Sequence, residues 1–327
     1  MKKAGPDKSI GGYQDLELPF FQANLDQASV KTNSARSAIK LTLDSVSAKK
    51  LWLPAYVCDA VVEAANDLCI DLEYYQISST FDVDGDLRLG KQEFILAIDY
   101  FGLTGDSVDR CLKKFGQGNT IVDCSQAYFS NHAGALATVW SPRKFFGLPD
   151  GGLLYSDDPR IRQPEHNDVT SADRMGHLIS RLTNSPEIAY QQYQKAEQEI
   201  AALPVSGLSS LTERLLHSVD SEAARAARNR NARYLHERLS EHNQLHLHVG
   251  DEKAPLCYPL LPKTKTASRS DLITKRVYLP TYWPEVLTRV EESSFEWNLV
   301  TNGLFLPCDQ RYTEEDMDRV ISLLAIQ

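Results

Sequence analysis

Short apolar runs alternate with amphipathic stretches through the first half of the chain. The apolar runs have the length and composition of buried strands, and the stretches between them have helical spacing. The pattern predicts strands at 51–54, 70–74, 94–98 and 120–123, and helices at 34–43, 61–68 and 107–115. Such alternation favours an α/β fold, with a mostly parallel sheet between two layers of helices.

The second half begins with two long polar stretches, 187–202 and 222–242, whose apolar residues recur near helical spacing. We expect them to cross from a large domain to a smaller α+β domain. Strands at 256–261 and 277–279 and a final helix from Thr313, with Asp316 in a capping box, are predicted to build that smaller domain. The final helix should bury Met317, Val320, Ile321 and Leu324. The expected divisions are an N-terminal arm over 1–30, a large domain over 31–210 and a small domain over 211–327.

Lys144 lies in a turn between two apolar runs, 136–140 and 153–155. The turn is rich in proline and glycine, and it closes on Gly151 and Gly152. Lysines are mostly exposed, so a surface lysine is the simplest interpretation of this residue. The pattern predicts a rigid, hairpin-like connection that presents the amine.

Two further features precede this lysine in the sequence. Asp123 ends an apolar strand, which is where open α/β sheets place ligand chemistry. The segment 33–38 is rich in hydroxyl and amide groups and predicts a helix start suited to phosphate. A pyridoxal phosphate site requires a helix start that binds phosphate, an acidic residue at a strand end and a lysine in a turn. Taken singly, Asp123 is equally explained as a cap of the next helix, and Ser34 or Ser37 as a helix cap.

The chain resembles the DegT/StrS family of sugar aminotransferases, within the fold-type I pyridoxal phosphate enzymes. The order and spacing of six blocks carry the resemblance: 33–38, 54–58, 99–102, 123–126, 144–152 and 306–312. It implies a fold-type I transferase, with a large domain whose mostly parallel mixed sheet lies between helices and a smaller α+β C-terminal domain. It also implies a homodimer with its site at a subunit boundary.

The resemblance assigns catalytic roles to two residues. Lys144 would bind the aldehyde carbon of pyridoxal 5'-phosphate and then carry a proton between the donor's α-carbon and the cofactor. A lysine partly desolvated in a turn can lose its proton near neutral pH. Asp123 would keep the pyridine nitrogen protonated, so that the ring accepts electrons.

Further cofactor-binding roles follow from the same resemblance. Gln126 would lie at the ring oxygen, and the phosphate would be bound by Arg36, Ser37 and Ser141, although many relatives have their serine two positions earlier. Cys58 occupies the place where relatives stack an aromatic residue on the ring. Tyr56 and Tyr128 are alternatives for that stacking contact.

The resemblance implies transfer of an amino group from glutamate to a nucleotide-linked keto-sugar, in the biosynthesis of amino sugars or surface polysaccharide. Related dehydratases replace the lysine with histidine, so Lys144 argues against that activity. The segment 160–186 lacks a clear counterpart of the tyrosine- and arginine-rich segment that reaches across the dimer in many relatives. Together with Cys58, this segment leaves open a non-catalytic protein that binds the cofactor or a sugar nucleotide as a sensor or scaffold.

Composition and charge narrow the classes of protein to which the chain could belong. A chain of 327 residues with 42% hydrophobic content can bury a large core. A net charge of −9 and a pI near 5.4 argue against nucleic-acid binding. The basic N-terminus lacks the apolar core of a signal peptide, and no apolar run approaches the length of a membrane span. We therefore expect a cytoplasmic protein without a membrane partner.

No metal site is expected from the sequence. The six cysteines are dispersed and predict reduced thiols. Acids in the segment 82–93 match several calcium-loop positions, but Leu87 stands where the loop requires glycine and 94–98 resembles a strand. His242, His246 and His248 lack a carboxylate or cysteine beside them and are expected in a solvated loop.

Overall fold

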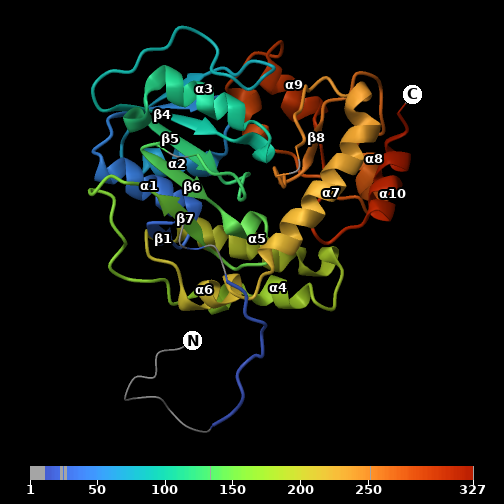
Figure 1. Ribbon diagram of the computed structural model, residues 1–327, viewed down its shortest axis with the longest axis horizontal. Coiled ribbons are helices and arrows are strands. Elements are labelled where there is room, and N and C mark those ends of the chain that lie inside the picture. Colours follow the sequence, from blue (N-terminus) through green and yellow to red (C-terminus); the bar gives the residue numbers. More distant parts are fainter. Residues whose placement is uncertain (1–11, 23–24, 26–27, 133, 251, 327) are drawn as a thin grey trace.

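The computed structural model describes residues 12–22, 25, 28–132, 134–250 and 252–326. A seven-stranded sheet lies at its centre, with the strand order β1-β7-β6-β5-β4-β2-β3 (Figure 1). The strands are β1 (Val30–Thr32), β2 (Lys50–Pro54), β3 (Asp71–Tyr75), β4 (Glu93–Ile98), β5 (Thr120–Cys124), β6 (Ala137–Trp140) and β7 (Gly152–Tyr155). Strands β2 to β6 pair in parallel, whereas β7 is antiparallel to both β6 and β1. The expected mostly parallel mixed sheet is confirmed.

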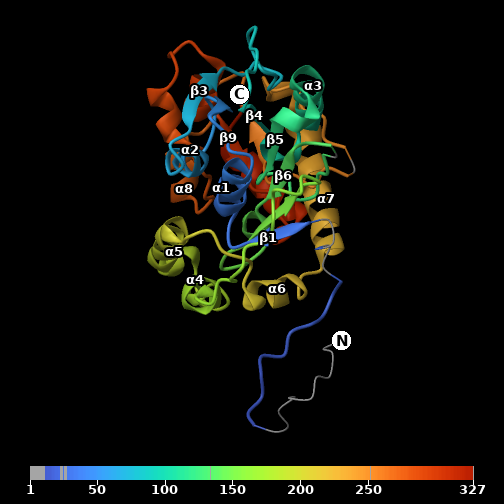
Figure 2. The same ribbon diagram turned by 90° about the vertical axis from the view of Figure 1, so that its left-hand side faces the viewer.

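Helices cover both faces of this sheet. Figure 2 shows α1 and α2 on one face and α3 on the other. The helices are α1 (Ala35–Ser45), α2 (Asp59–Asn66), α3 (Gly105–Phe115), α4 (Gly176–Ser180), α5 (Pro186–Ala202), α6 (Ser210–Leu216), α7 (Ser221–Leu239), α8 (Arg269–Thr274), α9 (Phe295–Asn302) and α10 (Glu314–Leu324). No helix in the described part of the chain is long and apolar enough to cross a membrane.

Side-chain caps explain where several helices begin. Ser34 accepts a hydrogen bond from the backbone N–H of Ser37 at the start of α1. At α10, Thr313 and Asp316 form the predicted capping box. Each cap of this kind stabilises a helix by about 1 kcal/mol. Of the apolar residues predicted on α10, Met317, Val320 and Leu324 are buried and Ile321 is half-buried.

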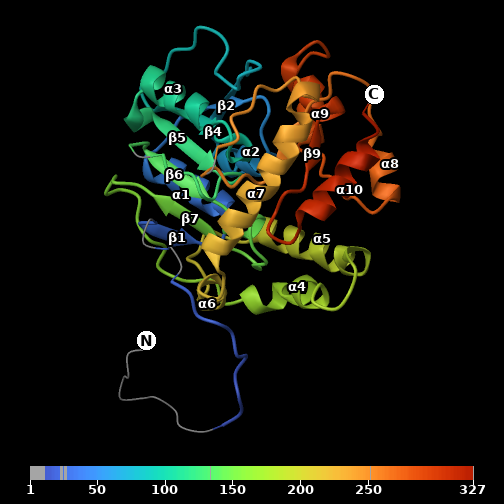
Figure 3. The same cartoon turned by 45° about the vertical axis from the view of Figure 1, so that its right-hand side comes forward.

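Two hydrophobic cores lie on either side of α7. The larger one surrounds the central sheet and includes Ala224 near the start of α7. The smaller one includes Ala232 and Leu239 of α7, α10, and the antiparallel pair β8 (Tyr258–Leu260) and β9 (Leu304–Leu306). Figure 3 shows α7 running diagonally between the sheet and this second group of elements. A smaller α+β unit is therefore present, and α7 leads into it.

The structure differs from the predicted elements at three places. The strand predicted at 277–279 is an irregular segment, because Val277 and Leu279 pack into the smaller core without a neighbouring strand to pair with. Strand β1 was not predicted, and it takes Val30 out of the expected arm. The helix predicted over 222–242 becomes 3-10 helix after Leu239.

The described part of the arm lies against α6. Arg214 donates to the carbonyl of Leu18, and the backbone N–H of Phe21 donates to the carbonyl of His217. Residues 1–11, 23–24 and 26–27 of the expected arm lie outside the described residues.

Candidate active site

The predicted site residues gather at one edge of the central sheet. Asp123 lies at the carboxyl end of β5, and Lys144 follows the carboxyl end of the neighbouring parallel strand β6. Strands β1 and β6 are both antiparallel to β7, so they run in the same direction, and Ser34 and helix α1 begin at that edge too. This is the edge at which open α/β sheets bind ligands.

Asp123 is buried, with 7% of its surface exposed. Its Oδ1 accepts a hydrogen bond of 2.7 Å from the backbone N–H of Ser125, and Oδ2 accepts none from the described residues. A turn follows the strand, so the alternative role as a cap of the next helix is wrong. A buried carboxylate with an unused oxygen is suited to a cationic hydrogen-bond donor.

Gln126 has one buried group without a partner. Its Oε1 accepts the backbone N–H of Phe101 at 3.0 Å, whereas Nε2 is buried and donates to none of the described residues. Such an unsatisfied donor costs about 1–3 kcal/mol, so its place in the turn three residues after Asp123 points to an acceptor supplied by a ligand. Phe101 has a φ of 60°, a backbone conformation that is concentrated at functional sites.

The turn that carries Lys144 is an antiparallel β6–β7 connection, as predicted. Lys144 is exposed and ends the 3-10 helix Pro142–Lys144. Gly151 has a φ of +117° and donates its N–H to the carbonyl of Asn33 at 2.8 Å. A side chain on Gly152 would collide with the backbone of Ser34. The glycine pair therefore lets the lysine turn close directly onto the start of α1.

The predicted phosphate-binding residues have different surroundings. Ser37 is buried beside Ser34, with their hydroxyl oxygens 3.0 Å apart, and Ser141 is buried at the start of the lysine turn. Arg36 instead donates to the carbonyl of Ala201 and lies 3.1 Å from a carboxylate oxygen of Glu63. The structure thus brings the two serines to the site edge and engages the Arg36 guanidinium with α5 and α2.

The residues considered for ring stacking also differ in their burial and in their neighbours. Cys58 is half-buried just before α2. The Tyr56 ring is fully buried against Tyr100 and Trp283, and the Tyr128 ring packs into another aromatic cluster. Both tyrosine rings pack in the core, so Cys58 stays the predicted residue for the stacking contact.

No protein-family model and no curated protein matches the sequence, but solved structures match the fold. Helicobacter pylori PseC, an aminotransferase involved in the biosynthesis of pseudoaminic acid, aligns with a TM-score of 0.60 and 14% identity over 91% of this chain and 87% of that chain. A DegT DnrJ EryC1 StrS aminotransferase from Brucella abortus aligns with a TM-score of 0.58 and 14% identity, over 90% of this chain and 84% of that chain. NtdA from Bacillus subtilis, with bound cofactor PMP, aligns with a TM-score of 0.60 and 17% identity, over 90% of this chain and 72% of that chain.

This chain has the DegT/StrS aminotransferase fold. The expected fold-type I architecture is therefore confirmed. Identities of 14–17% establish the fold alone, so the chemistry rests on the residues at the sheet edge.

Within this DegT/StrS fold, a buried ionic network that the sequence did not reveal holds the lysine turn. Asp150, just before the glycine pair, is fully buried and pairs with Arg174 at 2.7 Å. Arg174 also pairs with Asp168, and Thr212 donates to Asp150. Burial raises the pKa of Asp168, but hydrogen bonds from Thr170 and the charge of Arg174 outweigh it, so the net shift is downward. The divergent segment 160–186 thus supports the turn.

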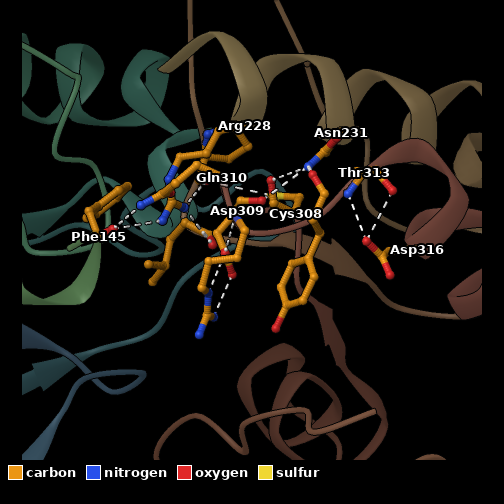
Figure 4. Close-up of polar contacts among 12 residues, drawn as sticks. Phe145, Arg228, Asn231, Cys308, Asp309, Gln310, Thr313 and Asp316 are labelled. Atoms are coloured by element: carbon orange, nitrogen blue, oxygen red, sulfur yellow. Dashed lines mark hydrogen bonds and ion pairs between the residues drawn. The ribbon is translucent and has the colours of Figure 1, made fainter. Parts of the chain in front are cut away.

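A second set of hydrogen bonds to the lysine turn comes from α7 and from the segment after β9. Arg228 of α7 and Gln310 both donate to the carbonyl of Phe145, the residue after Lys144 (Figure 4). Arg228 is four residues from Ala224 and four from Ala232, both buried. An arginine on the apolar stripe of a helix was the signal available in the sequence.

A pyridoxal phosphate suits these donors and acceptors. Lys144 offers an amine for its aldehyde carbon, and Asp123 a carboxylate for its ring nitrogen. The unpaired Nε2 of Gln126 offers a donor to the ring oxygen. The start of α1, with Ser37 and Ser141 at the same edge, is suited to its phosphate. Each chemical group of the cofactor finds a matching residue type at the site edge.

Proposed function

We propose that this chain is a pyridoxal phosphate-dependent aminotransferase that transfers an amino group from glutamate to a nucleotide-linked keto-sugar, in amino-sugar or surface polysaccharide biosynthesis. The observation that carries the proposal is the buried, unpaired Nε2 of Gln126 in the turn after Asp123, on the sheet edge that also presents Lys144. The likeness to amino-sugar aminotransferases supports the substrate class.

The residues divide the chemistry between them. When bound, the cofactor withdraws electrons from the bond that breaks at the donor's α-carbon. Asp123 would keep the ring nitrogen protonated, and Gln126 would orient the ring through its oxygen. Lys144 would hold the cofactor through its amine, and the same amine, when free, would move the proton that leaves the donor's α-carbon. The bonds to Asp150 and to the carbonyl of Phe145 hold the turn, and thereby the backbone of Lys144, in place.

We also propose that the active form is a cytoplasmic homodimer. Large apolar side chains are exposed on α4, on α5 and in the turn between them: Ile179 of α4, Leu182 of the turn at 83% exposure, and Ile188 of α5. In Figure 3 both helices lie at the lower end of the molecule, the end from which the N-terminal segment emerges. That segment exposes Leu16 and Phe20 as well. Several exposed apolar side chains on neighbouring elements are typical of an interface, and a second copy is the occupant that the family resemblance supports.

The test is an absorbance spectrum of the purified protein with pyridoxal phosphate, followed by glutamate. The wild type should form a covalent adduct that borohydride traps on Lys144, and glutamate should convert the cofactor to its amine form. Lys144→Ala should lose the long-wavelength band and the trapped adduct. Lys195→Ala, which removes an exposed lysine of α5, is the matched control.

Two outcomes would change the proposal. A trapped adduct on another lysine in the Lys144→Ala variant would reject Lys144 as the cofactor-binding residue. Cofactor binding without conversion by any amino donor would favour the non-catalytic sensor or scaffold.

A further inference from the structure

Arg228 is a cation buried between the two cores. Its residue surface is 2% exposed, and it lies midway along α7, where the helix passes from the larger core at Ala224 to the smaller core at Ala232. Burial lowers the pKa of its guanidinium, and no carboxylate among the described residues forms a hydrogen bond with it. Removing a cation from water without such a partner is costly.

The guanidinium connects main-chain segments from distant parts of the sequence. Nη1 donates to the carbonyls of Pro255 and Leu256 at 3.0 and 3.2 Å, and Nη2 donates to the carbonyl of Phe145 at 3.3 Å. Its carbon lies 4.6 Å from the centre of the Phe145 ring. Gln310 donates to the same Phe145 carbonyl at 2.8 Å, and Figure 4 shows both side chains converging on it.

The 254–256 segment, which contains the Pro255 and Leu256 carbonyls, continues this connection to the cofactor edge. The backbone N–H of Leu256 donates to the carbonyl of Phe101 at 2.9 Å. The backbone N–H of Phe101 in turn donates to Oε1 of Gln126. Arg228 therefore joins the residue after Lys144 to Gln126 through Leu256 and Phe101.

A neighbouring residue makes a separate set of bonds within the smaller unit. Asn231, about one turn further along α7, donates to the carbonyls of Cys308, Asp309 and Tyr312 (Figure 4). Those bonds attach the segment after β9 to α7. The bond from Arg228 to residue 145 instead crosses to the lysine turn.

We propose that Arg228 is a positioning residue, which couples the lysine turn to the 254–256 segment and so fixes Lys144 relative to Gln126. The proposal rests on the proposed function, because Lys144 and Gln126 matter together only if both face one ligand. Gln310 assists by binding the same carbonyl. Binding of pyridoxal phosphate at Lys144 should therefore stabilise the 254–256 segment, and loss of Arg228 should uncouple the two.

The experiment compares Arg228→Met and Arg228→Lys with Arg269→Met, measuring hydrogen exchange by mass spectrometry with and without pyridoxal phosphate. Arg269 is a matched control, because it is a half-buried arginine that donates to the carbonyl of Gly303 and makes no hydrogen bond to the lysine turn. Gln310→Ala tests the same carbonyl from its second donor. Thermal unfolding of each cofactor-free protein provides the correction for overall stability.

In Arg228→Met we expect amides of 143–148 to exchange at least tenfold faster than in Arg269→Met. The cofactor should slow exchange at 254–257 in the wild type and in Arg269→Met, but not in Arg228→Met. Arg228→Lys keeps the charge, but a single ammonium group cannot bind the Phe145 carbonyl and the 255–256 carbonyls together, so this variant should behave like Arg228→Met. Gln310→Ala should loosen 143–148 less, because Arg228 still binds the carbonyl. If Arg228→Met does not fold, Arg228→Lys and Gln310→Ala give the same comparison.

Equal exchange at 143–148 in the Arg228 and Arg269 variants would overturn the proposal, as would cofactor protection of 254–257 that survives the loss of Arg228. A wild type without a borohydride-trapped adduct on Lys144 would reject the proposed function instead. In that case the cofactor-free exchange comparison still decides whether Arg228 holds the turn.

Discussion

At the residue scale, Asp123 separates an enzyme from a binding protein. Asp123→Ala removes the carboxylate but leaves Lys144, so the cofactor should still bind. Proton transfer should slow by several orders of magnitude, each factor of ten being about 1.4 kcal/mol of barrier. Asp123→Asn should behave similarly, because an amide does not hold the ring nitrogen as a cation. The measurement is the rate at which glutamate converts the bound cofactor, followed by absorbance.

Asp71→Asn, at an exposed position on edge strand β3, is the control for that series. Conversion at the wild-type rate in both Asp123 variants would show that the carboxylate has no electronic role.

Glu296 gives a pH-dependent prediction. It is a buried acid whose Oε1 accepts the backbone N–H of Ile77 at 2.7 Å, and burial raises its pKa. With a folded-state pKa above the unfolded one, the folded state is penalised once the pH rises through and above both values. Glu296→Gln should therefore increase the free energy of unfolding at pH 7, and the gain should shrink as the pH falls toward about 4.

Denaturant unfolding across this pH range measures the effect. Glu292→Gln, at an exposed position just before α9, should show no such pH-dependent gain. A Glu296→Gln variant that is less stable than the wild type at pH 7 would mean that the charged form is needed for the bond to Ile77.

At the element scale, most helices and strands could be predicted because their pattern is local. Strand β5 is a continuous apolar run, and α1 begins at a serine cap that the sequence displays. The segment 277–279 has the same apolar pattern as a strand, yet pairing depends on a neighbour that no local pattern reveals. Strand β1 was missed for the converse reason, because its three residues become a strand only by pairing with β7.

The ionic network around Arg174 predicts a large effect on stability. Arg174→Met would leave the buried carboxylates of Asp150 and Asp168 without their cation, and breaking a buried pair in this way costs about 3–5 kcal/mol. Arg160→Met removes a solvent-exposed arginine that is paired with Asp158 and should cost no more than about 1 kcal/mol. Urea unfolding compares the two. Similar small losses would show that the network contributes little to holding the lysine turn.

At the scale of the whole molecule, the site was predictable only as far as sequence order implies topology. Asp123 and Lys144 follow neighbouring parallel strands, so the fold brings them to one edge. The contact between Arg228 and Phe145 joins residues 83 positions apart, and nothing in the sequence around either residue specifies it. The tyrosines considered for ring stacking were ambiguous for the same reason, since their burial is decided by packing partners elsewhere in the chain.

The exposed apolar side chains on α4, α5 and the turn between them give the prediction for assembly. The wild type should scatter light with about twice the mass of the 36.7 kDa chain. Ile179→Glu combined with Leu182→Glu places two charges on side chains that are 58% and 83% exposed, so each subunit should stay folded while a buried interface would be disrupted. Ile273→Glu, at a 42% exposed apolar position on α8, is the control and should remain dimeric.

The double variant should also lose glutamate turnover together with its dimeric mass, because the resemblance places the site at a subunit boundary. Loss of mass without loss of turnover would place the complete site within one chain. A monomeric wild type that binds the cofactor and turns over glutamate would be incompatible with the proposed dimer, and the exposed side chains of α4 and α5 would then require another partner.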